Sequence, residues 1–178
     1  EDNMIRGLIT KGFRSPNIRE MYMWGAANSD LSPESMINYE VAIGQSFLSG
    51  DLFTELTAFL IDGKDMIYSV SVNGDNRPPF QNRNIGSFLN KGIEFETRYR
   101  IMSDLELNMN YSYLHMSNPI PGAPAHKLYG GVTYSPGRFT LNVHVQSIFD
   151  LYTDTSCTKQ EDFTTLNAKV AYRFGHPD

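Results

Sequence analysis

The residue types that carry most enzyme and metal chemistry are sparse and scattered in this chain of 178 residues. The four histidines, His115, His126, His144 and His176, lack the short spacings that are typical of metal ligands. Cys157 is the single cysteine, so it has no disulfide partner within the chain, and no base lies near it in the sequence to activate it. The sequence therefore predicts no catalytic site, no metal site, no cofactor and no enzymatic activity.

Two of these histidines border a proline-rich segment, residues 117–126, that we expect to be a loop. His115 and His126 have the chemistry to ligate haem iron or a metal chelate. A solvated loop histidine is the more common occurrence, and we favour that interpretation for both.

A second candidate is the run of alternating charges Glu94, Glu96, Arg98 and Arg100. The residues between and beside them are mostly apolar, namely Ile93, Phe95, Tyr99 and Ile101. Such a run forms either a charged binding site or a water-facing wall whose charges pair with neighbours across strands. We expect the wall.

The elements that position these charges are β-strands. From Leu105 to Tyr113 apolar and polar residues alternate without a break, which is the period of a strand with one apolar and one polar face. Residues 102–104 are the only ones between this strand and the charged one, so the two form a tight hairpin. Its polar face carries more charge than a dry core holds unpaired.

The same alternation recurs along the chain. We expect eight strands, at residues 4–13, 37–47, 52–61, 93–101, 105–113, 127–134, 139–146 and 164–174. Long connections (14–36, 68–90, 117–126, 151–162) alternate strictly with short turns (49–51, 103–104, 135–137). The fold class is therefore all-β, an antiparallel meander, and this alternation is typical of outer-membrane β-barrels, with aromatic girdles formed by Tyr39, Tyr134, Phe139, Tyr172 and Phe174.

The composition fits that fold class. A formal charge of −5 and a pI near 5.3 make nucleic acid an unexpected partner. The mean hydropathy is −0.36, and no apolar run approaches the roughly 20 residues of a spanning helix. In a barrel only alternate residues face lipid, so low mean hydropathy is expected. The chain begins at Glu1 without a signal peptide, which suggests a processed or excised segment.

A series of short motifs points to a family. Residues 11–16 read Lys-Gly-Phe-Arg-Ser-Pro, residues 19–22 Arg-Glu-Met-Tyr, residues 28–34 Asn-Ser-Asp-Leu-Ser-Pro-Glu, residues 90–96 Asn-Lys-Gly-Ile-Glu-Phe-Glu, and residues 166–174 Leu-Asn-Ala-Lys-Val-Ala-Tyr-Arg-Phe. In this order they resemble the barrel of TonB-dependent outer-membrane receptors, over essentially the whole chain. Ser29 and Met21 depart from the family pattern, which usually has proline and leucine there.

The resemblance implies that residues 1–178 are one barrel segment, approximately strands thirteen to twenty of a twenty-two-stranded transmembrane barrel, without the plug domain and the TonB box. It implies location in the Gram-negative outer membrane and uptake of a scarce nutrient such as a siderophore, cobalamin, haem or glycan. The implied partners are outer-membrane lipid, the remainder of the same receptor, the TonB complex through the missing part, and an unidentified small molecule. Its ligand-binding residues are unknown, and we expect selectivity to lie in the four long connections.

An alternative remains open from the residues alone. Eight strands are enough to close a stand-alone barrel, either a small outer-membrane protein or a lipocalin-like ligand binder. Its interior would have to pair nearly all of the glutamate, arginine, asparagine and lysine side chains of the polar face. The segment of a larger receptor is the interpretation we prefer, and we expect the isolated segment to have open edges and no transport activity.

Overall fold

The computed structural model describes residues 3–72, 80–154 and 157–174, which form eight β-strands, one short α-helix and one 3-10 turn. The strands are β1 (Asn3–Arg14), β2 (Glu34–Phe47), β3 (Leu52–Ser71), β4 (Phe80–Met102), β5 (Leu105–Met116), β6 (Pro124–Tyr134), β7 (Phe139–Tyr152) and β8 (Gln160–Tyr172). Helix α1 (Ile18–Tyr22) lies between β1 and β2, and the turn η1 (Leu48–Gly50) joins β2 to β3. The predicted number and sequence of strands are confirmed.

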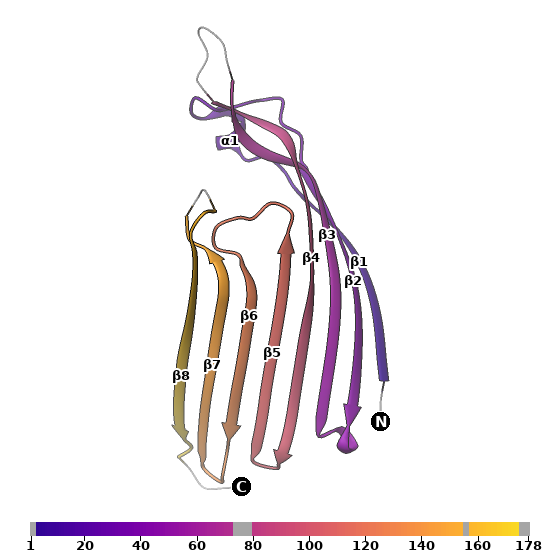
Figure 1. Cartoon of the computed structure of the whole chain (residues 1–178), viewed down its shortest axis with the longest axis vertical. Helices are drawn as coiled ribbons and strands as arrows, with labels where there is room; N and C mark the ends of the chain where they lie inside the picture. Colours follow the sequence, from indigo (N-terminus) through magenta and orange to yellow (C-terminus); the bar gives the residue numbers. More distant parts are fainter. Residues whose placement is uncertain (1–2, 73–79, 155–156, 175–178) are drawn as a thin grey trace. The chain divides into compact units, whose positions relative to one another are not determined.

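Each strand is hydrogen-bonded to its neighbours in sequence, in the order β1-β2-β3-β4-β5-β6-β7-β8 (Figure 1). The pairs from β5 to β8 are antiparallel, and one row of partners is Leu107, Val132 and Val143. The strands β1 and β8 end the order and do not pair with each other. The alternative of a closed eight-stranded barrel is therefore wrong, because closure requires that pair.

The alternation of residues separates two faces of β5, β6 and β7. One face carries an apolar set that is largely exposed, including Met109, Leu128, Val132, Leu141 and Val145. Among the residues that the structure describes, the only buried ones with apolar side chains are Leu31, Ala42 and Pro124. A sheet with so few buried apolar side chains cannot be stabilised by its own packing, so its apolar face requires a non-aqueous environment.

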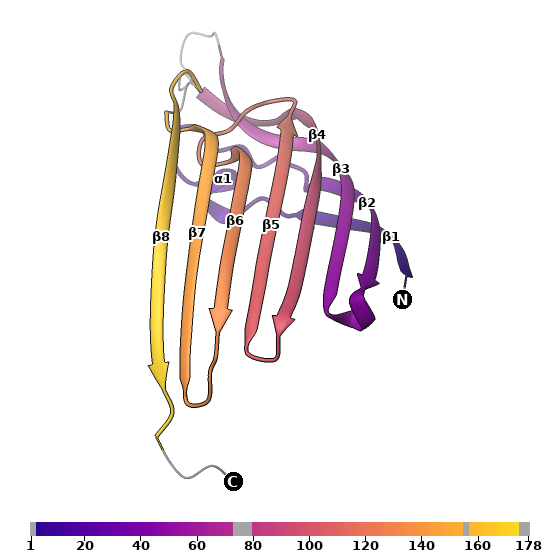
Figure 2. The same cartoon turned by 60° about the horizontal axis from the view of Figure 1, so that its bottom comes forward.

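Aromatic side chains mark both ends of that apolar face. Phe139 packs on Tyr172, and Tyr172 on Phe174, with 4.8 Å between ring centroids in each pair. These residues lie at the end where Figure 2 shows the short turns between β4 and β5 and between β6 and β7. At the other end of the strands, His126 lies 4.9 Å from Tyr113, ring to ring. The predicted grouping of aromatics near strand ends is confirmed for the first set.

Several strands are longer than predicted. The segment 68–90 was expected to be a loop, but β3 continues to Ser71 and β4 already begins at Phe80. That expectation rested on a high content of asparagine, glycine and proline, of which Asn73, Gly74, Asn76, Pro78 and Pro79 fall outside the described residues. Asn82 and Asn84 are strand residues, and the contacts of their side chains, given below, explain asparagine there. Likewise β6 begins at Pro124, β7 extends to Tyr152 and β8 begins at Gln160.

The contacts divide the chain into two compact units. One consists of residues 1–7, 40–59 and 91–178 and contains the short turns, and the other consists of residues 8–39 and 60–90 and contains α1. The only α-helix in the described part of the chain has five residues, and no helix there has the length and apolarity needed to traverse a bilayer.

Candidate functional site

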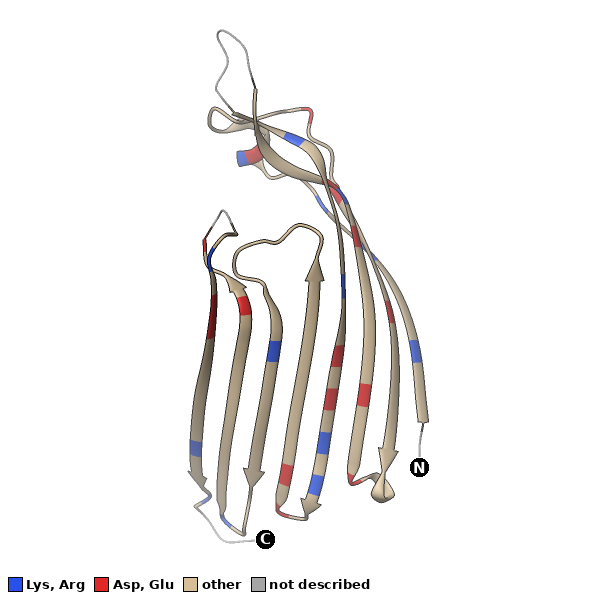
Figure 3. Ribbon diagram, viewed as in Figure 1, with Lys and Arg blue, Asp and Glu red and all other residues tan. Residues whose placement is uncertain are grey.

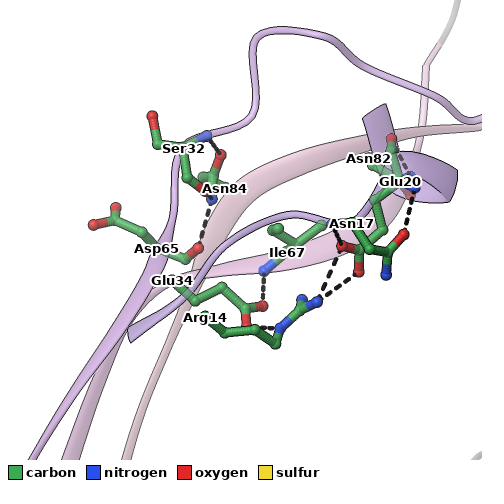
Figure 4. A network of polar contacts seen from close by, with 9 residues as sticks. All are labelled: Arg14, Asn17, Glu20, Ser32, Glu34, Asp65, Ile67, Asn82 and Asn84. Carbon is green, nitrogen blue, oxygen red and sulfur yellow. Dashed lines mark hydrogen bonds and ion pairs between the residues drawn. The ribbon is translucent and has the colours of Figure 1, made fainter. Parts of the chain in front are cut away.

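The densest polar network of the second unit surrounds Arg14, the last residue of β1 (Figure 4). Its Nε donates to Glu34 Oε2, and its Nη1 donates to both carboxylate oxygens of Glu20, at 3.1 and 3.0 Å. Glu34 is only 6% exposed, and its other oxygen accepts the backbone N–H of Ile67 at 2.8 Å. One arginine therefore joins the ends of two strands to the helix between them.

Helix α1 begins with a capping box. The Asn17 side chain accepts the N–H of Glu20, and the Glu20 side chain accepts the N–H of Asn17, both at 2.9 Å. This reciprocal pair satisfies two N–H groups that a helix start leaves without partners. The spacing Asn-x-x-Glu is a recognisable helix-start signal, and it is the one part of this network that the sequence displays locally.

The charges of the network stabilise one another. Hydrogen bonds from Arg14 lower the pKa of Glu34 and of Glu20 below the usual glutamate range, and the same bonds raise the pKa of Arg14. A carboxylate whose pKa is lowered on folding contributes stability above its unfolded pKa and loses it as the pH falls through the folded value. The stabilisation from these hydrogen-bonded charges is therefore present at neutral pH and is lost as the pH falls through the lowered pKa values of Glu20 and Glu34.

Two asparagines of β4 fasten the loop between β1 and β2 to the sheet. Asn82 donates from Nδ2 to the carbonyl of Glu20 at 3.1 Å, and its backbone N–H donates to the carbonyl of Ala26 at 2.7 Å. Asn84 donates from Nδ2 to the carbonyls of Ser32 and Asp65, at 2.9 and 2.7 Å, and accepts the N–H of Ser32 at 2.8 Å. We refer to Arg14, Glu20, Glu34, Asn82 and Asn84 together as the loop clamp.

Beside the loop clamp lies a hollow of about 390 Å³. Its lining residues come from the loop and from β4, namely Asn17, Arg19, Glu20, Met23, Trp24, Ala26 and Asn82. The guanidinium carbon of Arg19 lies 5.7 Å from the centroid of the Trp24 ring, which is a cation–π contact. Trp24 is 71% exposed and has a positive φ of 70°, a conformation that few non-glycine residues adopt. The hollow thus combines a cation, an aromatic face and amide groups.

The polar face of the first unit has a hollow of its own, of about 400 Å³. Among its lining residues are Glu94, Glu96, Lys127, Tyr129 and Gln146. Figure 3 shows the predicted run of charges as two acidic bands followed by two basic bands along the lower part of β4.

The expectation that this run pairs across strands is met at one residue. Arg100 lies 3.7 Å from Asp51, near the turn between β2 and β3. Glu94, Glu96 and Arg98 form no ion pair with any residue of the described ranges. Glu94 and Glu96 line the hollow together with Lys127 and with uncharged polar side chains such as Asn110. The expectation that all four charges pair across strands is therefore wrong. The expectation that the charges lie on the polar face is confirmed.

The histidines do not come together. His126 lies in β6, its Nδ1 is 2.8 Å from the hydroxyl of Tyr111, and its Nε2 is 3.7 Å from Asp150. It is therefore a bonded strand residue, and the expectation of a solvated loop histidine is wrong for it. His115 is an exposed residue of β5, His144 contacts the ring of Tyr129, and His176 lies outside the described residues. In the ranges described, no group of three or more metal-ligating side chains forms.

Cys157 remains a free thiol. Its Sγ donates to the carbonyl of Pro119 at 3.3 Å, so it joins two of the connections between strands.

The residues of the loop clamp and of the hollow beside it were not predicted as a site. Arg14, Arg19, Glu20 and Glu34 appear in the sequence motifs without an assigned role, and Trp24, Asn82 and Asn84 carried no signal for these contacts. Asn82 and Arg14 are far apart in the chain. Their segments come together because β1, β2, β3 and β4 pair one after another in the sheet.

An open antiparallel sheet with an exposed apolar face, a polar face and alternating turns and long connections defines the wall of a transmembrane β-barrel. The chain belongs to the family of TonB-dependent receptor-like β-barrels, whose model matches residues 1–178. This is a family of outer-membrane transport proteins, not of enzymes.

Individual relatives agree with this assignment. An iron-regulated outer membrane virulence protein of Vibrio cholerae serotype O1 is 33% identical, over 62% of this chain and 20% of that protein. A mutant of the ferric enterobactin receptor PfeA of Pseudomonas aeruginosa matches with a TM-score of 0.80 and 17% identity, over 98% of this chain and 31% of that one. The copper transporter OprC matches with a TM-score of 0.76 and 14% identity, over 97% of this chain and 30% of that one.

The chain thus spans about a fifth of the curated relative and about a third of the solved structures. Membership of the family places it in the outer membrane of Gram-negative bacteria.

Proposed function

We propose that the chain forms part of the barrel of a TonB-dependent transporter that takes up a scarce nutrient across the outer membrane. The observation that carries the proposal is the match of the family model to the whole chain, residues 1–178. Within a barrel of twenty-two strands, the eight strands would occupy positions thirteen to twenty. The partners are outer-membrane lipid, the plug and the remaining strands of the same receptor, the TonB complex, and the transported ligand.

Among the nutrients that such receptors carry, ferric chelates have the most support. The Vibrio cholerae relative is described as iron-regulated, and PfeA as a ferric enterobactin receptor. The hollow lined by Arg19 and Trp24 supplies a cation and an aromatic face, which suit an anionic ligand with planar groups. Cobalamin, haem and glycans remain the competing ligand classes, and copper is another, since OprC is a copper transporter.

Uptake by the full-length receptor tests this proposal. The receptor is expressed in a Gram-negative host that lacks its own ferric-chelate receptors, and accumulation of radiolabelled iron is measured for a panel of ferric chelates. We expect uptake of at least one chelate in cells with an active TonB complex and none in matched cells without it. Uptake that is equal in the two hosts would refute energy-coupled transport, and uptake of cobalamin, haem or copper alone would move the substrate to that class.

A further inference from the structure

We propose that the loop between β1 and β2 has two sets of residues with separate roles. The loop clamp fixes the shape of the loop whatever the ligand, and Arg19 with Trp24 selects ligands that present anionic oxygens. This inference rests on the proposed function, because it names the selecting residues of that receptor.

The polar atoms of the loop clamp are occupied by one another and by backbone. Arg14 donates to two carboxylates, and both oxygens of Glu34 accept hydrogen bonds. Asn84 makes three hydrogen bonds, two of them as a donor. Using these groups to bind a ligand would break bonds of the nearly buried Glu34, and an unsatisfied buried charge is costly. They are therefore positioning residues.

Arg19 is arranged differently. No carboxylate in the described chain forms an ion pair with its guanidinium, which contacts the Trp24 ring. A guanidinium that lies over a ring keeps its N–H edge free, and that edge matches the paired oxygens of a carboxylate or catecholate. The one acidic residue that lines the hollow, Glu20, is already engaged by Arg14.

The hollow has the size for a small ligand. Its volume of about 390 Å³ lies in the range of small-molecule sites, about 300 to 1,000 Å³. We therefore assign it to a small-molecule ligand that presents anionic oxygens and not to a protein partner, whose interface buries about 800 Å² on each side.

The backbone around Trp24 supports a preformed site. Ala27 donates its N–H to the carbonyl of Trp24 at 3.1 Å, and Asn28 donates its N–H to the carbonyl of Glu20 at 3.1 Å. These bonds and those of Asn82 hold Trp24 in its positive-φ conformation. A loop that is ordered before binding loses less entropy when the ligand arrives, so loss of the loop clamp is expected to weaken every ligand alike.

Binding measurements on the full-length receptor separate the two roles. The probes are two ferric complexes of different charge, an anionic tris-catecholate and a neutral trihydroxamate. We expect Arg19→Gln to weaken binding of the anionic complex by about tenfold and that of the neutral one by less than about twofold, since a charge-assisted bidentate contact is lost. Trp24→Leu acts in the same direction. Arg14→Gln weakens both complexes by the same factor, and Arg138→Gln, in the turn between β6 and β7, changes neither.

Hydrogen exchange tests the loop clamp without any ligand. We expect Arg14→Gln to speed amide exchange in residues 17–33, and Arg19→Gln to leave it unchanged, with heat-modifiable gel mobility showing that both barrels are folded. Unchanged exchange in Arg14→Gln overturns the positioning role. Equal weakening of both complexes by Arg19→Gln, or a wild-type receptor that binds neither complex, overturns the selection of anions. TonB-dependent uptake of another nutrient would leave the transporter assignment standing in either case.

Discussion

At the scale of single residues, the loop clamp shows what the motifs of the sequence encode. Arg14, Glu20 and Glu34 are the motif positions, and their side chains bond to one another. Arg19, which belongs to the same motifs, and Trp24, which lies between them, line the hollow. The motifs of this loop therefore contain both residues that hold the loop and a residue that faces the hollow.

Gly92 of β4 provides a residue-scale prediction. A Cβ at this position would lie 2.1 Å from the backbone carbonyl oxygen of Tyr113 and 2.5 Å from the ring of Phe59. Because the backbone of β5 cannot move aside as a flexible side chain does, we expect Gly92→Ala to destabilise the full-length barrel by about 1–3 kcal/mol. Urea unfolding in lipid vesicles measures the change.

Gly130 of β6 is the matched control, since a Cβ there would meet no atom within 4 Å. Gly130→Ala should therefore be neutral, or stabilise the barrel by about 0.4–1 kcal/mol through the lower entropy of the unfolded chain. If both glycines tolerate alanine equally, the close approach at Gly92 does not exist in the receptor.

At the scale of strands, the two faces of β5 should respond oppositely to charge. Leu107 lies in the apolar row with Val132 and Val143, and Asn108 lies in the next row with Gly131 and His144. We expect Leu107→Arg to destabilise the full-length barrel by about 2–4 kcal/mol, because arginine would enter the middle of the lipid. Asn108→Arg should cost less than about 0.5 kcal/mol, as at other exposed sites.

The same unfolding experiment in vesicles compares the two variants. The side chain of Asn108 donates to Glu106 at 3.1 Å, and an arginine there retains that acceptor. If the costs were reversed, the polar face would be the one that meets lipid, and the assignment of the faces would be wrong.

How far the strands could be predicted depended on how strictly they alternate. The period of two located the first residues of β5 and β7, because Leu105 to Tyr113 and Phe139 to Gln146 alternate without a break, although β7 continues past the predicted end to Tyr152. It failed for the last residues of β3 and the first residues of β4. Asparagine is typical of turns, but Asn82 and Asn84 are strand residues whose side chains donate hydrogen bonds to the loop between β1 and β2. The hollow could not be predicted, because the positive φ of Trp24 and the approach of Asn82 from β4 have no signal in the sequence, although the rest of its lining lies within residues 17–26.

At the scale of the whole molecule, the order of strands leaves β1 and β8 as edges. Every residue of β8 is exposed, including Leu166 at 70% and Val170 at 71%. An unpaired strand edge is a template for pairing with another chain. We therefore expect the isolated 178-residue chain to form oligomers or to require detergent, and to show no transport.

Light scattering coupled to size-exclusion chromatography measures this, with and without detergent, and the full-length receptor in detergent is the control. We expect the control to be monomeric. A monodisperse monomer of the isolated chain in plain buffer would mean that the sheet protects its edges by itself, contrary to the strand order.

The scarcity of buried apolar side chains, with Leu31, Ala42 and Pro124 as the only ones in the described chain, also changes what a conservative substitution is. In a packed interior, a shorter side chain leaves a void whose volume adds to the cost. Lipid is a fluid and fills such a space, so on the apolar face of β5 to β7 the size and branching of a residue are nearly free to vary while its polarity is not. Sequences in this family should therefore diverge widely in shape at these positions, and relatives with little identity can share one fold, as the 17% identity and TM-score of 0.80 with PfeA illustrate.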